Sequence, residues 1–312
     1  MYKRQALDAN TTASGNTALG YNSLGANTTG EDNTGVGKNA LGANTTANNN
    51  TAIGKQALAA NTTGTQNTAV GAAALDAVLS GNDNTALGYI ALSNATGSQN
   101  TALGSRALQD MGTGDDNTAI GYHALHTNTT ASDNTAVGSH GLYLNTTGAN
   151  NVAVGYYSLS ANTTGTENTA VGALALDAST TSNENTAVGY NALTANTTGA
   201  HNTAVGADAL KGVTTGSYNQ GFGRDAGQSI TTGSGNVCLG NNANDAGNTS
   251  YVVSIGGFSA SANTVDGTTA VGYYALRNSS TGTGNHAFGY YALDQVTTGS
   301  YNTAVGLSLI HI

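Results

Sequence analysis

The chain repeats one unit of 17 residues, Asn-Thr-Ala-Val-Gly-Tyr-x-Ala-Leu-x-Ala-Asn-Thr-Thr-Gly-x-x, along almost its whole length. A glycine follows each small-plus-aliphatic pair and marks the register from Gly20 to Gly306. Fourteen of the seventeen intervals between these glycines are 17 residues long. A unit this short cannot bury a core alone and must stack on its neighbours. The period therefore predicts one continuous solenoid instead of the two globular domains suggested by a length of 312 residues.

The composition limits the class of protein. Only 8% of the residues are charged and proline is absent, so order must come from regular backbone pairing. The formal net charge of −9 argues against nucleic acid or an anionic membrane as a partner. Cys238 is the single cysteine and replaces an alanine of the repeat, which indicates a small buried residue and excludes an intrachain disulfide.

Each unit contains two small-then-large pairs, such as Ala52-Ile53 and Ala57-Leu58. Neighbouring residues of a strand point to opposite faces, so we expect the large member to fill a core and the small member to form a smooth outer strip. Recurrent Asn-Thr-Thr-Gly runs would interrupt a helix every turn or two. The pattern predicts an all-β parallel β-roll, or β-solenoid, of about eighteen coils with two short strands per coil. The smooth strip predicts a parallel homo-oligomer, most simply a trimer.

Asparagine stands four residues before the register glycine in sixteen of eighteen units. Stacked asparagine amides can bond to the backbone of a turn and to one another, so we predict a structural ladder. Glycosylation is the alternative, because Asn-Thr-Thr and Asn-Thr-Ala fit the acceptor pattern. The predicted ladder includes Asn16, Asn33, Asn50, Asn67, Asn84, Asn100, Asn117 and Asn134.

Tyrosine recurs directly after the register glycine, where it alternates with residues such as Lys38 and Arg224. Variable side chains at one place indicate an outward face, and tyrosine combines contact area with a polar tip. We therefore expect these tyrosines either to contact a receptor or glycan or to pack across coils. They are Tyr21, Tyr89, Tyr122, Tyr156, Tyr190, Tyr273 and Tyr290.

Metal chemistry has few candidates. His123 and His140 are 17 residues apart and should be neighbours, with His126 as a third possible ligand, although an exposed pair without metal is the simpler interpretation. Acidic residues also gather before the asparagine column, where solvated turns explain them better than a calcium edge, because the Gly-Gly-x-Gly-x-Asp nonapeptide is absent. These acids are Glu31, Asp32, Asp83, Asp115, Asp116, Asp133, Glu167 and Glu184.

The motifs Asn-Thr-Ala-Val-Gly and Asn-Val-Ala-Val-Gly, the latter at 151–155, resemble the head repeats of trimeric autotransporter adhesins. The resemblance covers 6–306 and implies a left-handed parallel β-roll, side-by-side association of three chains, and binding to host or environmental surfaces. Similar arrays occur in phage-type tail fibres that carry a self-cleaving chaperone. The adhesin repeats are usually shorter, so the resemblance implies an enlarged turn in this chain.

Three segments depart from the repeat. Between 220 and 269 the unit degrades, which predicts a bend, an altered coil or a loop that carries a specific contact. Residues 1–5 and 307–312 do not continue the repeat, and their possible codons are reverse complements, TAT AAG AGA CAG and CTG TCT CTT ATA. We therefore interpret both ends as translated sequencing adapter.

These observations predict a non-catalytic segment of an extracellular trimeric fibre, on a bacterial surface or a virion tail, for multivalent attachment. No catalytic motif, cofactor site or membrane contact is expected. A phage tail fibre is the first alternative. Ice binding is the alternative of another class, but Thr28 and Thr29 are adjacent and must diverge, whereas Thr-x-Thr would place two hydroxyls on one face.

Overall fold

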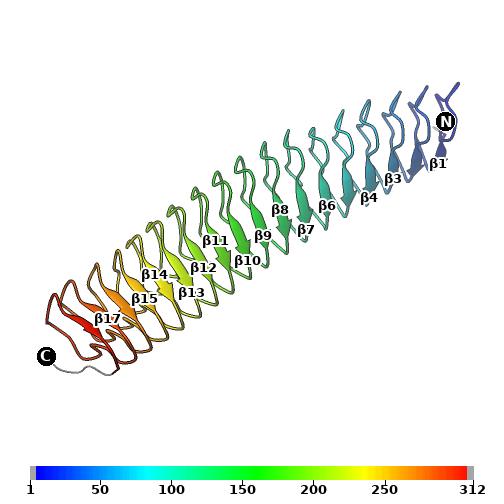
Figure 1. Cartoon of the computed structure of the whole chain (residues 1–312). Helices are drawn as coiled ribbons and strands as arrows, with labels where there is room; N and C mark the ends of the chain where they lie inside the picture. The colour runs from blue at the N-terminus through cyan, green and yellow to red at the C-terminus, as the bar shows by residue number, and fades with distance from the viewer. Residues whose placement is uncertain (1–4, 308–312) are drawn as a thin grey trace. The chain divides into compact units, whose positions relative to one another are not determined.

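The computed structural model describes residues 5–307. These residues contain eighteen strands and no helix, and the chain separates into two compact units, 1–153 and 154–312. We call them the N-terminal and C-terminal units and describe each by itself (Figure 1). The all-β prediction is confirmed. Residues 1–4 and 308–312, to which most of the adapter prediction applies, lie outside the described part.

Every strand is a three-residue segment that ends just before the register glycine. The N-terminal unit contains β1 (Thr17–Leu19), β2 (Thr34–Val36), β3 (Thr51–Ile53), β4 (Thr68–Val70), β5 (Thr85–Leu87), β6 (Thr101–Leu103), β7 (Thr118–Ile120) and β8 (Thr135–Val137), and β9 (Val152–Val154) spans the boundary in sequence. The C-terminal unit contains β10 (Thr169–Val171), β11 (Thr186–Val188), β12 (Thr203–Val205), β13 (Gln220–Phe222), β14 (Val237–Leu239), β15 (Val253–Ile255), β16 (Thr269–Val271), β17 (His286–Phe288) and β18 (Thr303–Val305).

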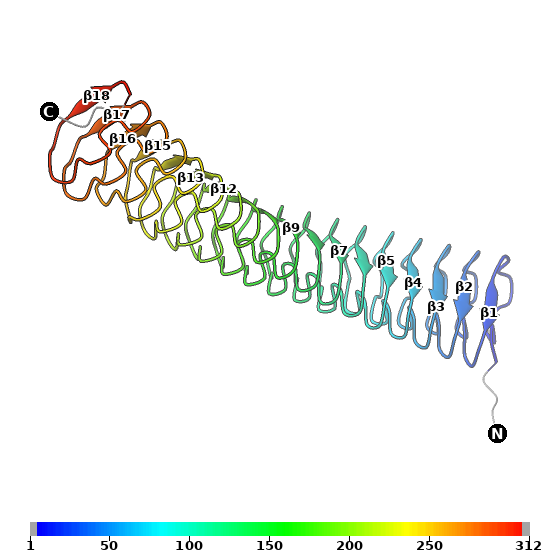
Figure 2. The same ribbon diagram turned by 90° about the horizontal axis from the view of Figure 1, so that it is seen from below.

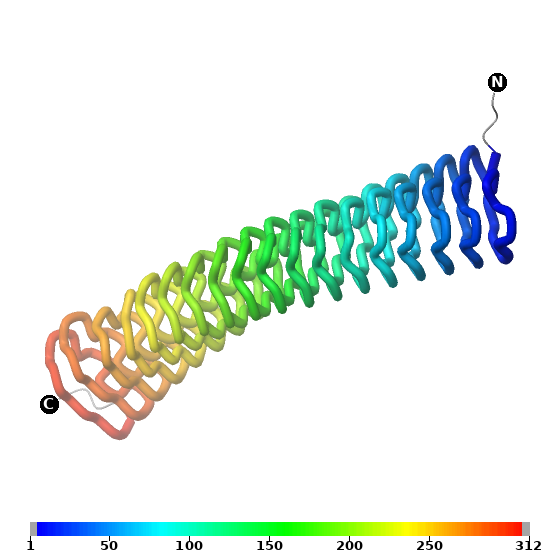
Figure 3. The backbone as a smooth tube through the Cα atoms, turned by 90° about the horizontal axis from the view of Figure 1, so that it is seen from above, coloured from blue at the N-terminus to red at the C-terminus, as the bar shows by residue number. Residues whose placement is uncertain are grey.

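Consecutive strands within each unit pair in parallel, each residue with its equivalent one repeat later (Figure 2). Thr17 pairs with Thr34 in the N-terminal unit, for example. The 16-residue interval between Thr85 and Thr101 leaves the pairing intact, so the missing residue is absorbed in a turn. Each unit is therefore a parallel β-solenoid whose coils follow the sequence period (Figure 3).

Each repeat contains one strand, not the two that were predicted. The second pair, for example Ala40-Leu41, lies in a turn in which Leu41 adopts a φ of 50°. Its backbone still bonds to the next coil, since the Leu41 N–H donates to the Ala57 carbonyl oxygen at 3.0 Å. Left-handed φ bends the chain instead of extending it. The leucine therefore lies at a corner of the coil.

The interior of each coil is built from the strand alanine together with the alanine and leucine of the corner. Ala52, Ala57 and Leu58 are all fully buried, and the same places are buried in most coils of both units. The strand aliphatic points the other way: Ile53 is 42% exposed. The prediction that the large member of the first pair fills the core and the small member forms an outer strip is therefore wrong. The corner leucine fills the coil and leaves room only for alanine beneath the strand.

Two backbone features keep neighbouring coils in close contact. Gly20 has a φ of 130°, and a Cβ placed on it would lie 2.7 Å from the carbonyl oxygen of Gly37 in the next coil. Only glycine fits this register position, which explains its recurrence. The corner leucines accept left-handed φ at a cost of about 1–2 kcal/mol each. Full burial of a leucine contributes about 1.5–3 kcal/mol and offsets that cost.

The coils between 220 and 269 keep their strands in register, from β13 to β16. Their interiors differ: Gly227 stands at the corner position of leucine. A Cβ on Gly227 would lie 3.0 Å from Ile230 Cδ1 and 3.2 Å from Cys238 Sγ. Ile230 and Cys238, which replace asparagine and alanine of the repeat, thus fill the space of the missing leucine. The segment is a set of altered coils.

Candidate functional site

The predicted asparagine column lies inside the coils and connects them. Asn33, Asn50 and Asn67 are fully buried. Asn50 Oδ1 accepts the N–H of Asn67 at 3.0 Å, and Asn50 Nδ2 donates to the Gly64 carbonyl oxygen at 2.9 Å. Each amide therefore satisfies one donor and one acceptor of the next coil. Of the eight residues named from the sequence, Asn16 is half-buried and the other seven are buried.

A second asparagine column occupies the Asn-Thr-Thr segment and was not predicted as a ladder. Asn44 Nδ2 donates to Asn27 Oδ1 at 2.9 Å and to the Ala47 carbonyl oxygen at 3.0 Å, and Asn61 repeats the arrangement. Both columns are buried, so the acceptor patterns for glycosylation place their amides inside the coil. The strict recurrence of Asn-Thr-Thr could have identified this column.

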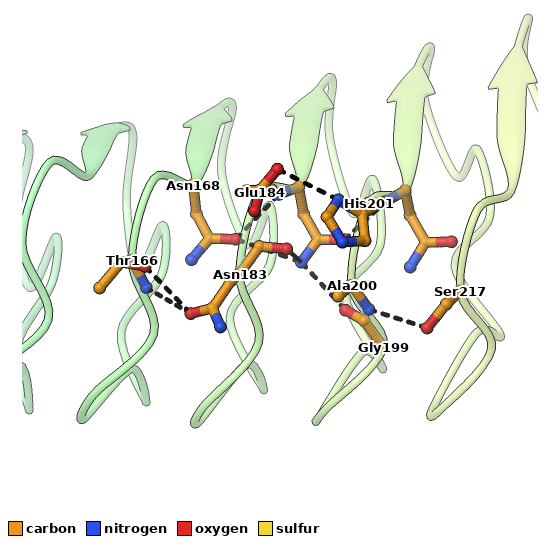
Figure 4. Close-up of polar contacts among 10 residues, drawn as sticks. Thr166, Asn168, Asn183, Glu184, Gly199, Ala200, His201 and Ser217 are labelled. Atoms are coloured by element: carbon orange, nitrogen blue, oxygen red, sulfur yellow. Dashed lines mark hydrogen bonds and ion pairs between the residues drawn. The ribbon is translucent and has the colours of Figure 1, made fainter.

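Two further ladders connect the outer turns. Thr163 Oγ1 donates to the Thr180 carbonyl oxygen at 3.0 Å, and Thr28 does the same to Thr45 at 3.1 Å. On the other side of the turn, Asn183 Oδ1 accepts the Thr166 N–H at 2.8 Å and Ser217 Oγ accepts the Ala200 N–H at 3.1 Å (Figure 4). The first hydroxyl of the Thr-Thr pair is therefore occupied by the backbone, which weakens the case for an ice-binding face there.

All seven tyrosines that follow the register glycine lie on the surface, with exposed fractions between 41% and 56%. They contact neighbours of the same column: the Tyr273 and Tyr290 rings stack at 5.8 Å, and Lys38 Nζ lies 5.8 Å from the centre of the Tyr21 ring. Cross-coil packing and exposure thus coexist. The column can present polar tips, but stacking covers part of the ring faces of Tyr273 and Tyr290.

The three candidate histidines form one aromatic cluster. His123 stacks on His140 with ring centroids 5.3 Å apart and on His126 with centroids 4.6 Å apart. His123 is only 7% exposed, and burial, reinforced by the neighbouring His126, His140 and Arg106, lowers its pKa to about 4. Burial also lowers the pKa of His126, although Asp110 opposes the shift. Within residues 5–307, no group of three His, Cys, Asp or Glu side chains is arranged to hold a metal ion.

Two of the acidic turn residues contact the neighbouring coil through their carboxylates. Asp115 Oδ1 accepts the Ser98 N–H at 2.7 Å, and Glu184 Oε2 lies 3.2 Å from His201 Nδ1 (Figure 4). Cys238 is buried, and burial raises the pKa of its thiol to about 12, so it is a packing residue and not a nucleophile.

The described residues contain no helix of the length and apolarity needed to cross a membrane. Comparisons with protein-family models and with curated proteins gave no match.

Proposed function

We propose that the chain is a non-catalytic segment of an extracellular trimeric fibre that attaches to a surface through many repeated contacts. The observation that supports this proposal most directly is a row of apolar side chains, each exposed or half-buried, on the outer face of the strands. We call it the strand-face row. It consists of Leu19, Val36, Ile53, Val70, Leu87, Leu103, Ile120 and Val137 in the N-terminal unit and of Val171, Val188, Val205, Phe222, Leu239, Ile255, Val271, Phe288 and Val305 in the C-terminal unit.

The strand-face row is more apolar and more regular than a protein surface that contacts only solvent. Ile53, Leu87 and Leu103 are 42–46% exposed in the N-terminal unit, and Leu239 (46%) and Phe288 (39%) are similarly exposed in the C-terminal unit. Strand pairing brings successive members within about 4.8 Å of one another, so the row is continuous within each unit. Continuous exposed apolar surfaces mark interaction sites.

A second copy of the chain is the partner that fits this face. The two outward positions of every strand carry no Lys, Arg, Asp or Glu, so the net charge of −9 lies elsewhere and does not oppose contact through the strands. An identical chain in parallel orientation has the same spacing and matches the row coil by coil. Three chains arranged around one axis bury all three rows in a common apolar centre.

Burial of the strand face in a trimer leaves the variable columns outside, which favours attachment instead of catalysis. Three copies of each column multiply weak contacts into avidity. A bacterial adhesin head and a phage tail fibre use this arrangement equally well, and in both we expect this segment to contact neither nucleic acid, a cofactor nor a membrane. The resemblance to adhesin head repeats favours the first.

The oligomeric state tests the proposal. We expect light scattering and sedimentation to give three chains per particle. Substitution of Ile53, Leu87 and Leu103 by lysine places like charges on the strand face of each chain, and we expect this variant to be monomeric and to lose retention on cell or surface preparations.

The matched control carries lysine at Thr46, Thr63 and Thr130, which are exposed turn residues of the same unit. It has the same charge as the strand-face variant and should remain trimeric. A wild-type chain that stays monomeric at all concentrations contradicts the proposal, and so does a strand-face variant that stays trimeric.

A further inference from the structure

One column of the C-terminal unit departs from the rest of its repeat. The residue directly before the asparagine column adopts left-handed φ in both units, close to 60°. In most coils it is Asn, Asp, Gly, Glu or Gln, for example Asp133 and Gly235. In the C-terminal unit three tyrosines occupy it: Tyr218 (φ 60°), Tyr251 (φ 58°) and Tyr301 (φ 58°). We call these three residues the turn tyrosines.

The backbone disfavours tyrosine at these places. Left-handed φ is tolerated by Gly, Asn and Asp and is unusual for a bulky residue. The corner leucines offset the same cost by burial, but Tyr218 and Tyr251 are 63% and 72% exposed. Folding therefore gains little from these rings. An exposed residue that the backbone disfavours points to a role outside the fold.

The neighbouring glycines make room for the rings. A Cβ on Gly235 would lie 2.9 Å from Cδ1 of Tyr251, and a Cβ on Gly284 would lie 2.8 Å from Cδ1 of Tyr301. On the far side of Tyr251, the equivalent place in the next coil is Gly267, where no atom lies within 4 Å of a Cβ position. Tyr251 therefore has backbone on one side and open space on the other.

Tyr218 is arranged in a similar way. Its ring stacks on His201 with centroids 4.8 Å apart and planes 14° apart. The residue at the same place in the following coil is Gly235, which has no side chain to cover the other ring face. One face of the ring is thus held in place and the other remains available.

Neutral hydroxyl groups lie beside the turn tyrosines. Ser217 Oγ accepts the Ala200 N–H, Ser234 Oγ accepts the Ser217 N–H at 3.0 Å, and Ser250 Oγ accepts the Ser234 N–H at 3.2 Å. A hydroxyl that accepts one bond can still donate its own hydrogen. The column thus offers aromatic faces next to hydroxyl donors from Tyr218 onward. Glu167 and Glu184 precede them in the same column, and Asp266 Oδ1 accepts the Ser250 N–H at 2.8 Å.

We propose that the turn tyrosines form a binding site for a neutral polysaccharide whose sugar rings lie against their free ring faces, between coils. The apolar C–H face of a pyranose stacks on a tyrosine ring, and its hydroxyls bond to the serine and tyrosine oxygens. Tyr218 and Tyr251 are two coils apart, about 10 Å, so each ring can take a separate sugar. Tyr301 lies three coils further, and a polymer whose sugars reach several rings gains affinity from several weak contacts.

This inference rests on the proposed attachment function and names its ligand class. The test uses the full chain in its oligomeric form and measures binding to immobilised β-glucan, mannan and galactan. We expect one of these polymers to retain the wild type. The double variant Tyr251→Asn and Tyr301→Asn should bind at least about tenfold more weakly, because two ring contacts are lost. Tyr251→Phe keeps the ring and should bind within a few-fold of the wild type.

Thermal unfolding separates this role from a structural one. Asparagine accepts left-handed φ, so the double asparagine variant should unfold at the same temperature as the wild type or a higher one. Retention by none of the three polymers, or unchanged binding of the double variant, overturns the inference. A trimer that adheres to cells without binding these polymers overturns the glycan site alone, whereas a monomer that does not adhere overturns the proposed function.

Discussion

The coils of the N-terminal unit and those between 220 and 269 form the same strand ladder around different interiors. In the first group a corner leucine, two alanines and two asparagine columns fill the coil. In the second group Gly227 stands at the leucine corner, and Ile230 and Cys238 occupy the space it leaves. Strand register is nevertheless identical. The comparison indicates that backbone pairing and left-handed corners define the coil, while interior volume is a constraint that several combinations satisfy.

The largest effect should come from the corner leucine of a regular coil. Leu58→Ala removes a fully buried side chain and leaves a cavity, because the strands above and below fix the width of the coil. We expect the free energy of unfolding to fall by about 2–5 kcal/mol, measured by chemical denaturation. Ala260, in an altered coil, already lacks this leucine. Its substitution by glycine should cost less, and an equal loss would remove the distinction between the two groups of coils.

Acid should lower the stability of the coils that carry the histidine cluster more than that of the other coils. The folded-state pKa of His123 is about 4, below the ordinary value of 6.5, so the unfolded chain binds the proton first. Stability should be constant above about pH 6.5 and should decrease by at most about 3 kcal/mol as the pH falls to about 4. Denaturation midpoints across this range measure the effect.

The control for the acid effect is His123→Asn, because asparagine occupies the equivalent place at Asn22 and Asn39 with the same left-handed φ. This variant should lose most of the pH dependence, apart from the part that comes from His126. An unchanged pH profile would show that the cluster does not bury a neutral imidazole.

A single substitution that restores leucine at Gly227 should destabilise the altered coil. Gly227→Leu brings extra atoms against Leu210, Ile230 and Cys238, and we expect a loss of about 1–3 kcal/mol. The triple variant with Ile230→Asn and Cys238→Ala recreates a regular interior and should recover most of that loss. If the stability changes of the three substitutions are simply additive, Ile230 and Cys238 do not compensate for the missing leucine.

The sequence predicted the period, the parallel pairing and the importance of the asparagine column, because these depend on recurrence. The prediction of which face of the strand is inside was wrong, since the alanine and not the aliphatic residue is buried. Alternation in Thr-Ala-Val separates alanine from valine but treats both faces alike, and the width left by the corner leucine decides between them. The leucine corner itself was predicted as a strand, because leucine rarely adopts left-handed φ.

The surface was predictable only in part. Tyrosines after the register glycine were identified as exposed, since variability at one place indicates an outward face. The turn tyrosines were missed, because Tyr218 and Tyr251 replace residues of a turn and do not recur with the period. Their role could be inferred only from the structure, which shows their left-handed φ and the neighbouring glycines.

The smallest expected effect concerns a polar pair inside an altered coil. Ser254 and Ser259 replace two buried alanines of the regular coil, and their hydroxyls lie 2.7 Å apart. Ser259→Ala removes one partner of the Ser254 hydroxyl, which keeps its bond to the backbone carbonyl oxygen of residue 259 at 2.8 Å, and we expect a loss of at most about 1 kcal/mol. When Ser254→Ala is added, both polar groups are gone and stability should return to about the wild-type value. The double-mutant cycle is measured by denaturation. A double variant that is less stable than either single variant would contradict this expectation. The two serines would then stabilise the altered coil by more than the hydrogen bond between them, and alanines could not replace them as an equivalent packing.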